Sequence, residues 1–303
     1  MRPARTNGPG TGMLSARKDE QFWGYTFILP NFLSTAVFLF IPLIYSLYIS
    51  FMDWDMIKQP EFIGLANYTV KLAQDTQFFL ALKNTVVYSV VSIPLGIALA
   101  IFVAYLLSGN LKGNSVFRSV VFMPVIISTV AVSMIWKWLL NGDYGVVNYL
   151  LSLVGLQGVH WLGDAKYAMG TIIAISIWKN LGFNVVILIA AFKDVPSSYF
   201  ESAALDGANE WQKLTRISLP LIAPSVFFVT IMSVINSFQV FDLIYNLTLG
   251  GPNGATTVLY YLVYQNAFRF FDMGYASALS WIVFAIIFLF TMLQMRMNKE
   301  QSI

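Results

Sequence analysis

The chain has 303 residues, of which 57% are hydrophobic, 16% aromatic and only 11% charged. A soluble domain carries about 25% charged residues, so this composition excludes an ordinary soluble protein and indicates a helical membrane protein. The formal net charge of +3 is small, and we expect no nucleic-acid partner. There is no cysteine and only one histidine, His160, which excludes disulfides, thiolate chemistry and a histidine metal cluster. We therefore expect no metal site and no catalytic site.

Runs of roughly 20 apolar residues, the length that crosses a bilayer core, recur along the chain. They predict an all-α polytopic membrane protein with six transmembrane helices. Residues 1–20 are basic and rich in Gly and Pro, so we expect a disordered cytoplasmic tail before a membrane domain of residues 21–298, with a short second tail at residues 299–303. The predicted spans are residues 22–51, 85–107, 119–140, 167–192, 220–245 and 276–295.

A polar loop, residues 193–219, separates the fourth and fifth predicted spans, and its sequence predicts two short helices. Ser198 followed three residues later by Glu201 is a capping-box pattern that begins a helix. Gly207 can adopt the left-handed conformation that ends this helix, and Asn209 can cap a second one. Pro220 then removes a backbone donor, so we expect the fifth span to begin there.

The distribution of Lys and Arg predicts the orientation of the chain. With the N-terminus inside, the inner segments carry more Lys and Arg than the outer ones, which places the loop 193–219 and both termini in the cytoplasm. No internal repeat is evident in the sequence. That absence argues against a secondary transporter built from inverted halves.

The polar loop also carries a family resemblance. Residues 201–208, Glu-Ser-Ala-Ala-Leu-Asp-Gly-Ala, followed by Ile217-Ser-Leu-Pro220, resemble the EAA loop of ABC importer permeases, with Ser202 where that family usually has Ala. The resemblance extends to carbohydrate importers, because three more elements are similar to theirs. These are Phe-Ile-Gly-Leu-Ala-Asn-Tyr at residues 62–68, Phe117-Arg118 with Met123-Pro124, and Trp136-Lys-Trp138.

In this family the first short helix of the loop, the coupling helix, docks into a cleft on a cytoplasmic ATPase. The resemblance implies that Glu201 is an anionic contact for the ATPase, although its role could also be limited to the capping box. Ala203 and Ala204 would allow close packing into the cleft. Asp206 and Gly207 would form the end of the helix and the tight turn.

The resemblance also implies a set of partners. They are a second homologous permease, two copies of the ATPase, an extracytoplasmic solute-binding protein and a sugar, all at a prokaryotic inner or plasma membrane. The chain has no G-x-x-x-x-G-K-[ST] loop for a nucleotide phosphate. We therefore expect no cofactor in this chain and no enzymatic activity of its own, since ATP and Mg would be bound by the partner ATPase.

The solute path is predicted from polar residues inside the spans, which are costly in lipid and usually face a cavity or the bundle. Amides beside aromatic rings such as Phe238 and Phe241 suit a sugar, whose hydroxyls need donors and acceptors. The alternative for each candidate is interhelical hydrogen bonding that holds the bundle together. The candidates are Asn180 and Asn184 on the fourth span, and Asn236, Ser237, Gln239 and Asp242 on the fifth.

Three other functions stay open at this point. A glycerol 3-phosphate importer would share the loop motifs, but a phosphate should require basic residues in the cavity, and only Lys179 lies within a span. An ion- or proton-coupled secondary transporter would need buried acids, and Asp242 is the one candidate near a span interior. A membrane protein without a solute path is the third. We expect a permease for a neutral sugar or oligosaccharide.

Overall fold

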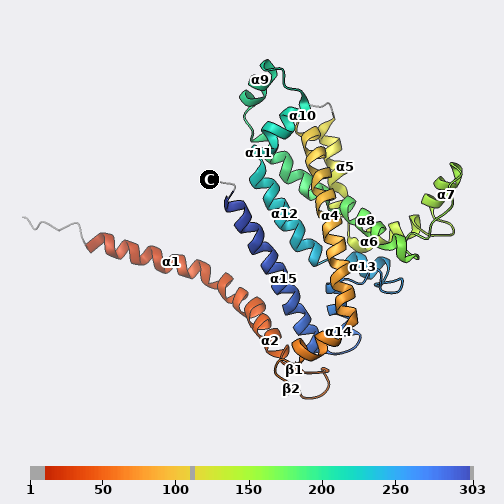
Figure 1. Cartoon of the computed structure of the whole chain (residues 1–303). Helices are drawn as coiled ribbons and strands as arrows, with labels where there is room; N and C mark the ends of the chain where they lie inside the picture. Colours follow the sequence, from red (N-terminus) through yellow and green to blue (C-terminus); the bar gives the residue numbers. More distant parts are fainter. Residues whose placement is uncertain (1–10, 110–112, 301–303) are drawn as a thin grey trace, which may run out of the picture.

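The computed structural model describes residues 11–109 and 113–300, with side chains described for residues 22–109 and 113–296. Almost all regular structure is helical, which confirms the expected all-α fold (Figure 1). Long helices are α1 Thr11–Thr35, α4 Thr76–Ser108, α5 Asn114–Ile126, α6 Thr129–Leu139, α8 Ala165–Lys193, α12 Ala223–Phe238, α14 Leu259–Phe268 and α15 Met273–Glu300. Shorter ones are α2 Ile41–Ile49, α3 Leu72–Gln74, α7 Val146–Leu153, α9 Ser197–Leu205, α10 Glu210–Gln212, α11 Leu219–Leu221 and α13 Asp242–Leu247. Three π-helical segments are η1 Ala36–Phe40, η2 Asn67–Lys71 and η3 Lys213–Ser218.

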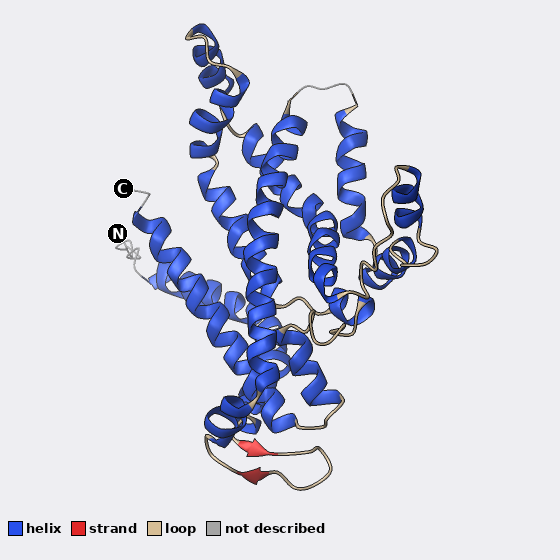
Figure 2. Ribbon diagram, turned by 45° about the vertical axis from the view of Figure 1, so that its right-hand side comes forward, coloured by secondary structure: helices blue, strands red, loops and turns tan. Residues whose placement is uncertain are grey.

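The centre of the molecule is a bundle of α4, α8, α12 and α15. Helix α4 runs along α8, and α12 packs against both of them and against α15 (Figures 1 and 2). Ala100 and Ala104 of α4 are fully buried against Val185 and Leu188 of α8 and Val229 of α12. These alanines lie four residues apart on one face of α4, and such small residues let helices approach closely in a membrane.

The two ends of the bundle carry different elements, a helical loop at one end and a short hairpin at the other (Figure 1). Helix α9 projects at one end (Figure 1). At the other end, β1 (Met52–Asp53) and β2 (Glu61–Phe62) form an antiparallel pair in which Met52 lies opposite Phe62. The polar loop and this hairpin therefore lie on opposite sides of the bundle.

Two of the predicted spans are bent in the structure, and the second span begins earlier than predicted, at Thr76 of α4 and not at residue 85. Four helices of the described chain are long and apolar enough to cross a membrane, and two bent pairs raise the number to as many as six. The third span is broken between α5 and α6, which meet at 99°, and the fifth is broken at Ile222, with a 75° bend before α12. Pro124 and Pro224 lie beside these breaks, where proline removes a backbone donor. The predicted spans of residues 119–140 and 220–245 are therefore each formed by more than one helix.

The N-terminal helix also corrects the predicted tail. Residues 11–20 belong to α1, so the expected disordered segment can extend no further than residues 1–10, which lie outside the described residues. The helix diverges from the bundle (Figure 1). Nearly every described side chain of the arm from Phe22 to Tyr48 is exposed, and most are apolar. Such a surface is compatible with lipid as the solvent.

Candidate functional site

A polar cavity of about 270 Å³ lies between α4, α8 and α12. Four of the six residues predicted for the solute path line it, although they come from two helices that are far apart in the sequence. Aliphatic side chains such as Ile93, Ile97 and Leu181 complete the wall. The polar residues in the wall are Tyr88, Ser92, Ser176, Asn180, Asn184, Ser233, Asn236 and Ser237.

The three asparagines are not used to join helices. The Asn180 amide donates to Ser176 O, one turn earlier on its own helix, at 3.0 Å. The amides of Asn184 and Asn236 make no hydrogen bond to any described residue, and Asn236 is exposed. The cavity therefore presents amide donors and acceptors that a solute could satisfy.

The hydrogen bonds between helices near the cavity are formed by hydroxyl groups instead. The Tyr88 hydroxyl on α4 is hydrogen-bonded to the Ser176 hydroxyl on α8. Ser89 Oγ donates to Ser237 Oγ on α12 at 2.9 Å, with both groups buried. Ser237 thus lines the cavity while it also joins two helices, as the alternative interpretation of the polar residues proposed.

The sequence analysis missed four polar residues of the cavity wall: Tyr88, Ser92, Ser176 and Ser233. A four-residue spacing could have revealed two sets of them, because residues 88 and 92 share one face of α4. Residues 176, 180 and 184 likewise share one face of α8. Ser237 was the one hydroxyl residue among the predicted candidates, which were otherwise amides and an acid, so the other hydroxyls of the wall were overlooked.

Two predicted path residues lie away from this cavity. Helix α12 ends at Phe238, so Gln239 follows the helix and Asp242 is the first residue of α13. Neither one lines the cavity. The expected stacking ring is also different, because Phe238 is buried against Phe290 of α15 at a centroid distance of 5.7 Å. The aromatic side chains in the cavity wall are Tyr88 and Phe183.

Lys179 is half-buried, but it does not line the cavity. Its ammonium group donates to the carbonyl oxygen of Ile127 at 3.2 Å, just beyond the C-terminus of α5. A cation at the negative end of a helix dipole is favourable, and here it compensates the break between α5 and α6. Among the described residues, the cavity wall therefore holds no charged side chain.

The polar loop forms two short helices, as predicted, although the first begins differently. Helix α9 starts at Ser197 after Pro196 and has no side-chain cap, so the expected Ser198–Glu201 capping box does not form. The helix ends in a Schellman motif, in which Ala208 N donates to Ala203 O at 2.9 Å. Gly207 adopts the left-handed conformation there, at φ +77°. Asn209 and Gln212 form a complete capping box, which confirms the predicted second start.

Helix α9 is exposed over most of its surface. Glu201 and Ala204 are exposed, as are Asp206 and Gly207 after the helix, whereas Ala203 is buried. The Leu205 side chain is 90% exposed at the tip of the loop. Helix α9 therefore presents an acid and a leucine on its outer surface.

The fold and these two features define a helical membrane protein with a polar central cavity and a projecting helical loop. Residues 92–301 match the family described as binding-protein-dependent transport system inner membrane component. A probable ABC transporter permease of Bacillus subtilis, YesP, is 36% identical over 92% of this chain and 91% of the relative. The trehalose/maltose transport permease MalF of Thermococcus litoralis is 33% identical over 91% of this chain and 93% of the relative.

A solved structure agrees with these relatives. It is a bacterial ABC transporter involved in the import of the acidic polysaccharide alginate, with a TM-score of 0.84 and 27% identity over 95% of this chain and 99% of that one. The chain belongs to the binding-protein-dependent family of inner membrane transport components. The resemblance to ABC importer permeases that the polar loop indicated is thereby confirmed.

Proposed function

We propose that this chain is the transmembrane permease subunit of an ATP-driven, binding-protein-dependent importer for a neutral sugar or oligosaccharide. One observation carries the proposal: the uncharged cavity, in which Asn180, Asn184 and Asn236 offer amide groups beside serine hydroxyls. Hydrogen-bonding amides in a cavity suit the hydroxyls of a sugar. Relatives named as trehalose/maltose, multiple sugar-binding and lactose permeases support a carbohydrate substrate.

The charge of the cavity supports a neutral solute over an anionic one. A phosphate or a uronate requires a cation for its charge, and Arg or Lys is the usual choice. Lys179 of α8 is next in sequence to Asn180 of the cavity wall, but its ammonium group is directed at the carbonyl oxygen of Ile127. A glycerol 3-phosphate importer is accordingly the weaker alternative. A proton-coupled transporter is weaker too, because Asp242 is exposed and lies outside the cavity.

We place the loop 193–219 in the cytoplasm, where α9 docks on a partner ATPase through the exposed Glu201, Ala204, Asp206 and Gly207, while the buried Ala203 packs behind this surface. The projecting position of α9 supports this role (Figure 1). A second homologous permease completes the path. A solute-binding protein delivers the sugar from outside, and a related structure contains a periplasmic protein bound to an alginate pentasaccharide. Closure of two ATPase copies on ATP and Mg would switch the cavity between its two openings by rigid-body motion.

The test begins with purification of the chain in mild detergent together with its partners, followed by reconstitution and uptake assays with radiolabelled sugars. Asn180→Ala and Asn236→Ala should each raise the KM for uptake about five- to tenfold, the effect of one lost hydrogen bond in the path. Gln239→Ala is the matched control, since Gln239 is also exposed but lies outside the cavity.

Two results would contradict the proposal. If no ATPase accompanies the chain in several detergents, the importer assignment fails. If the complex assembles and transports but both asparagine variants retain the wild-type KM, then the cavity is not the solute path. Glu201→Ala tests the docking role separately, because it should weaken capture of the ATPase without altering the KM for the solute.

A further inference from the structure

A second cavity, of about 520 Å³, lies between α6, α7 and α8. Four aromatic side chains form much of its wall: Trp136 of α6, Trp161 of the loop before α8, and Tyr167 and Trp178 of α8. The rings of Trp136 and Trp178 meet edge to face at a centroid distance of 5.5 Å. We call this cavity the aromatic groove. It shares no residue with the polar cavity of the proposed solute path.

The aromatic groove offers few hydrogen bonds to a ligand. Thr171 Oγ1 in its wall donates to Tyr167 O on the same helix at 2.9 Å. The indole N–H of Trp161 donates to Asn148 Oδ1, also at 2.9 Å. Little of the wall is polar, so a sugar would lose more water contacts here than the groove could replace, whereas a hydrocarbon chain has none to lose. The groove therefore suits an apolar ligand.

The length of the aromatic groove matches one leaflet of a bilayer. Lys166 and Trp178 mark its extent along α8, and at 1.5 Å per residue they lie about 18 Å apart along the helix axis. One leaflet of a typical bilayer contributes about 15 Å of hydrocarbon. Since α8 is a membrane span, a groove that starts in its first turn extends from the interface to about the bilayer centre.

The charged side chain of Lys166 lies at the interfacial end of the aromatic groove. Lys166 Nζ lies 5.1 Å from the ring centroid of Tyr167, and no described carboxylate lies within ion-pair distance of it. The neighbouring Asp164 instead accepts from the backbone N–H of Lys166 at 2.9 Å and caps α8. Nearby, α7 exposes Tyr149, Leu150 and Leu153, as interfacial helices do.

We propose that the aromatic groove binds an anionic phospholipid of the phosphatidylglycerol type. One acyl chain lies along Tyr167, Gly170 and Trp178, and the phosphate pairs with Lys166. The proposal requires only that α8 spans a membrane, so it holds or fails independently of the sugar-transport function.

The experiment uses the full chain with whatever partners accompany it, delipidated in detergent and titrated with phosphatidylglycerol or phosphatidylcholine. Retained lipid is counted by native mass spectrometry. Wild type should retain phosphatidylglycerol more tightly, and Lys166→Gln should lower that affinity about fivefold while phosphatidylcholine binding is unchanged. Lys137→Gln, an exposed lysine outside the groove, is the control for loss of charge.

A second pair of variants tests the acyl chain. A Cβ added at Gly170 would meet no atom within 4 Å, so Gly170→Leu should fold, extend into the groove and abolish retention of both lipids. Gly170→Ala should retain them. A photoreactive residue in place of Ala174 should crosslink to lipid in native membranes. Undiminished retention in Gly170→Leu, or a crosslink from position 174 to a second permease in place of lipid, would overturn the proposal.

Discussion

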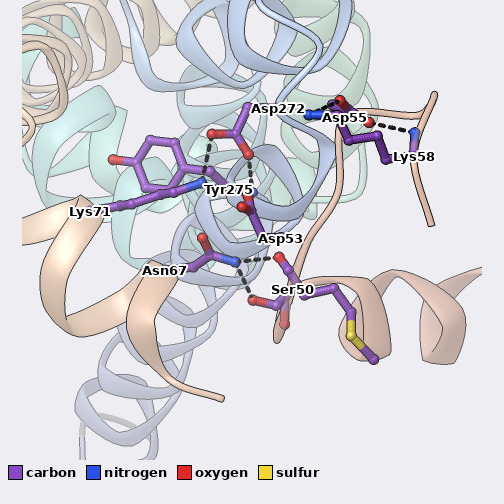
Figure 3. Close-up of polar contacts among 9 residues, drawn as sticks. Ser50, Asp53, Asp55, Lys58, Asn67, Lys71, Asp272 and Tyr275 are labelled. Atoms are coloured by element: carbon purple, nitrogen blue, oxygen red, sulfur yellow. Dashed lines mark hydrogen bonds and ion pairs between the residues drawn. The ribbon is translucent and has the colours of Figure 1, made fainter. Parts of the chain in front are cut away.

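Lys71 Nζ lies 2.9 Å from Asp272 Oδ2 (Figure 3). This ion pair joins η2 to the residue that precedes α15. Asp53 at the end of β1 contacts the same ammonium at 3.2 Å. Asn67, one turn before Lys71, donates to the carbonyl oxygens of Ser50 and Met52 at 2.9 Å each. One lysine and one asparagine of η2 thus fasten the hairpin end of the N-terminal arm to the central bundle.

Loss of this ion pair should lower the stability of the hairpin end. Lys71→Met leaves Asp53 and Asp272 facing each other without a cation, and we expect a loss of about 1 kcal/mol, since the pair is only partly buried. The melting temperature, followed by tryptophan fluorescence in detergent, should fall by about 2–4 °C. Lys58→Met is the control, because that lysine is 84% exposed and 3.7 Å from Asp55. Equal melting temperatures for wild type and Lys71→Met would remove the stabilising role.

The same pair predicts a dependence on alkaline pH. Burial lowers the pKa of Lys71, but the hydrogen bond and charge of Asp272, with a further contribution from Asp53, raise it overall. A raised folded-state pKa means that the stabilisation is complete below the ordinary value of 10.5 and is lost as the pH rises through the folded-state value. The difference in melting temperature between wild type and Lys71→Met should therefore be constant from pH 7 to about pH 10 and shrink above it. A difference that shrinks already at neutral pH would contradict the assignment to Lys71.

Sequence reasoning identified the local features well. The capping pair Asn209 and Gln212 and the left-handed Gly207 depend on residues within one or two turns, so they could be read directly from the chain. Asn180 and Asn184 were assigned to one helix face by their spacing, and both line the cavity. In contrast, the Ser198–Glu201 capping box does not form, because Pro196 occupies the N-cap position, two residues before Ser198, and α9 begins at Ser197.

The differences from expectation concern features that depend on tertiary contacts. Hydropathy cannot detect the break after Ile126, because the residues on both sides of it are apolar and the exposed carbonyl is compensated by Lys179, more than 50 residues away. The end of α12 at Phe238 similarly removed Gln239 and Asp242 from the cavity. The hydroxyl pairs Tyr88–Ser176 and Ser89–Ser237 join helices whose proximity no local pattern predicts.

Gly182 is expected to determine the approach of α5 to α8. A Cβ at this position would lie 2.5 Å from Val121 O and 2.8 Å from Phe122 Cα, both of which are backbone atoms that cannot rotate away. Gly182→Ala should destabilise the protein by about 1–3 kcal/mol and widen the separation of the two helices. Gly170→Ala on the same helix is the matched control, because its Cβ meets open space, and its stability should be unchanged or higher. A melting temperature for Gly182→Ala at or above the wild-type value would show that α5 can move aside without cost.

The final prediction concerns how the projecting loop is attached to the bundle. The Tyr105 hydroxyl on α4 donates to Glu210 Oε2 of α10 at 2.8 Å. Lys213 Nζ forms an ion pair with the other carboxylate oxygen, Glu210 Oε1, at 2.7 Å. The Tyr105 ring also packs edge to face on Phe192, near the end of α8. The described contacts of α9 are mainly with η3, so a movement of α9 would reach α4 through this base of the loop.

If the loop couples an ATPase to transport, Tyr105→Phe should loosen that connection. We expect about two- to fivefold less uptake per ATP hydrolysed, which corresponds to the modest energy of one exposed ionic hydrogen bond. The KM for the solute should stay at its wild-type value, because Tyr105 lies outside the polar cavity. Glu210→Gln keeps an acceptor for the hydroxyl and should be the milder variant. Tyr149→Phe, on the exposed helix α7, serves as the control. Uptake and ATP hydrolysis are measured together in reconstituted complexes, and an unchanged ratio in Tyr105→Phe would show that motion reaches α4 by another route.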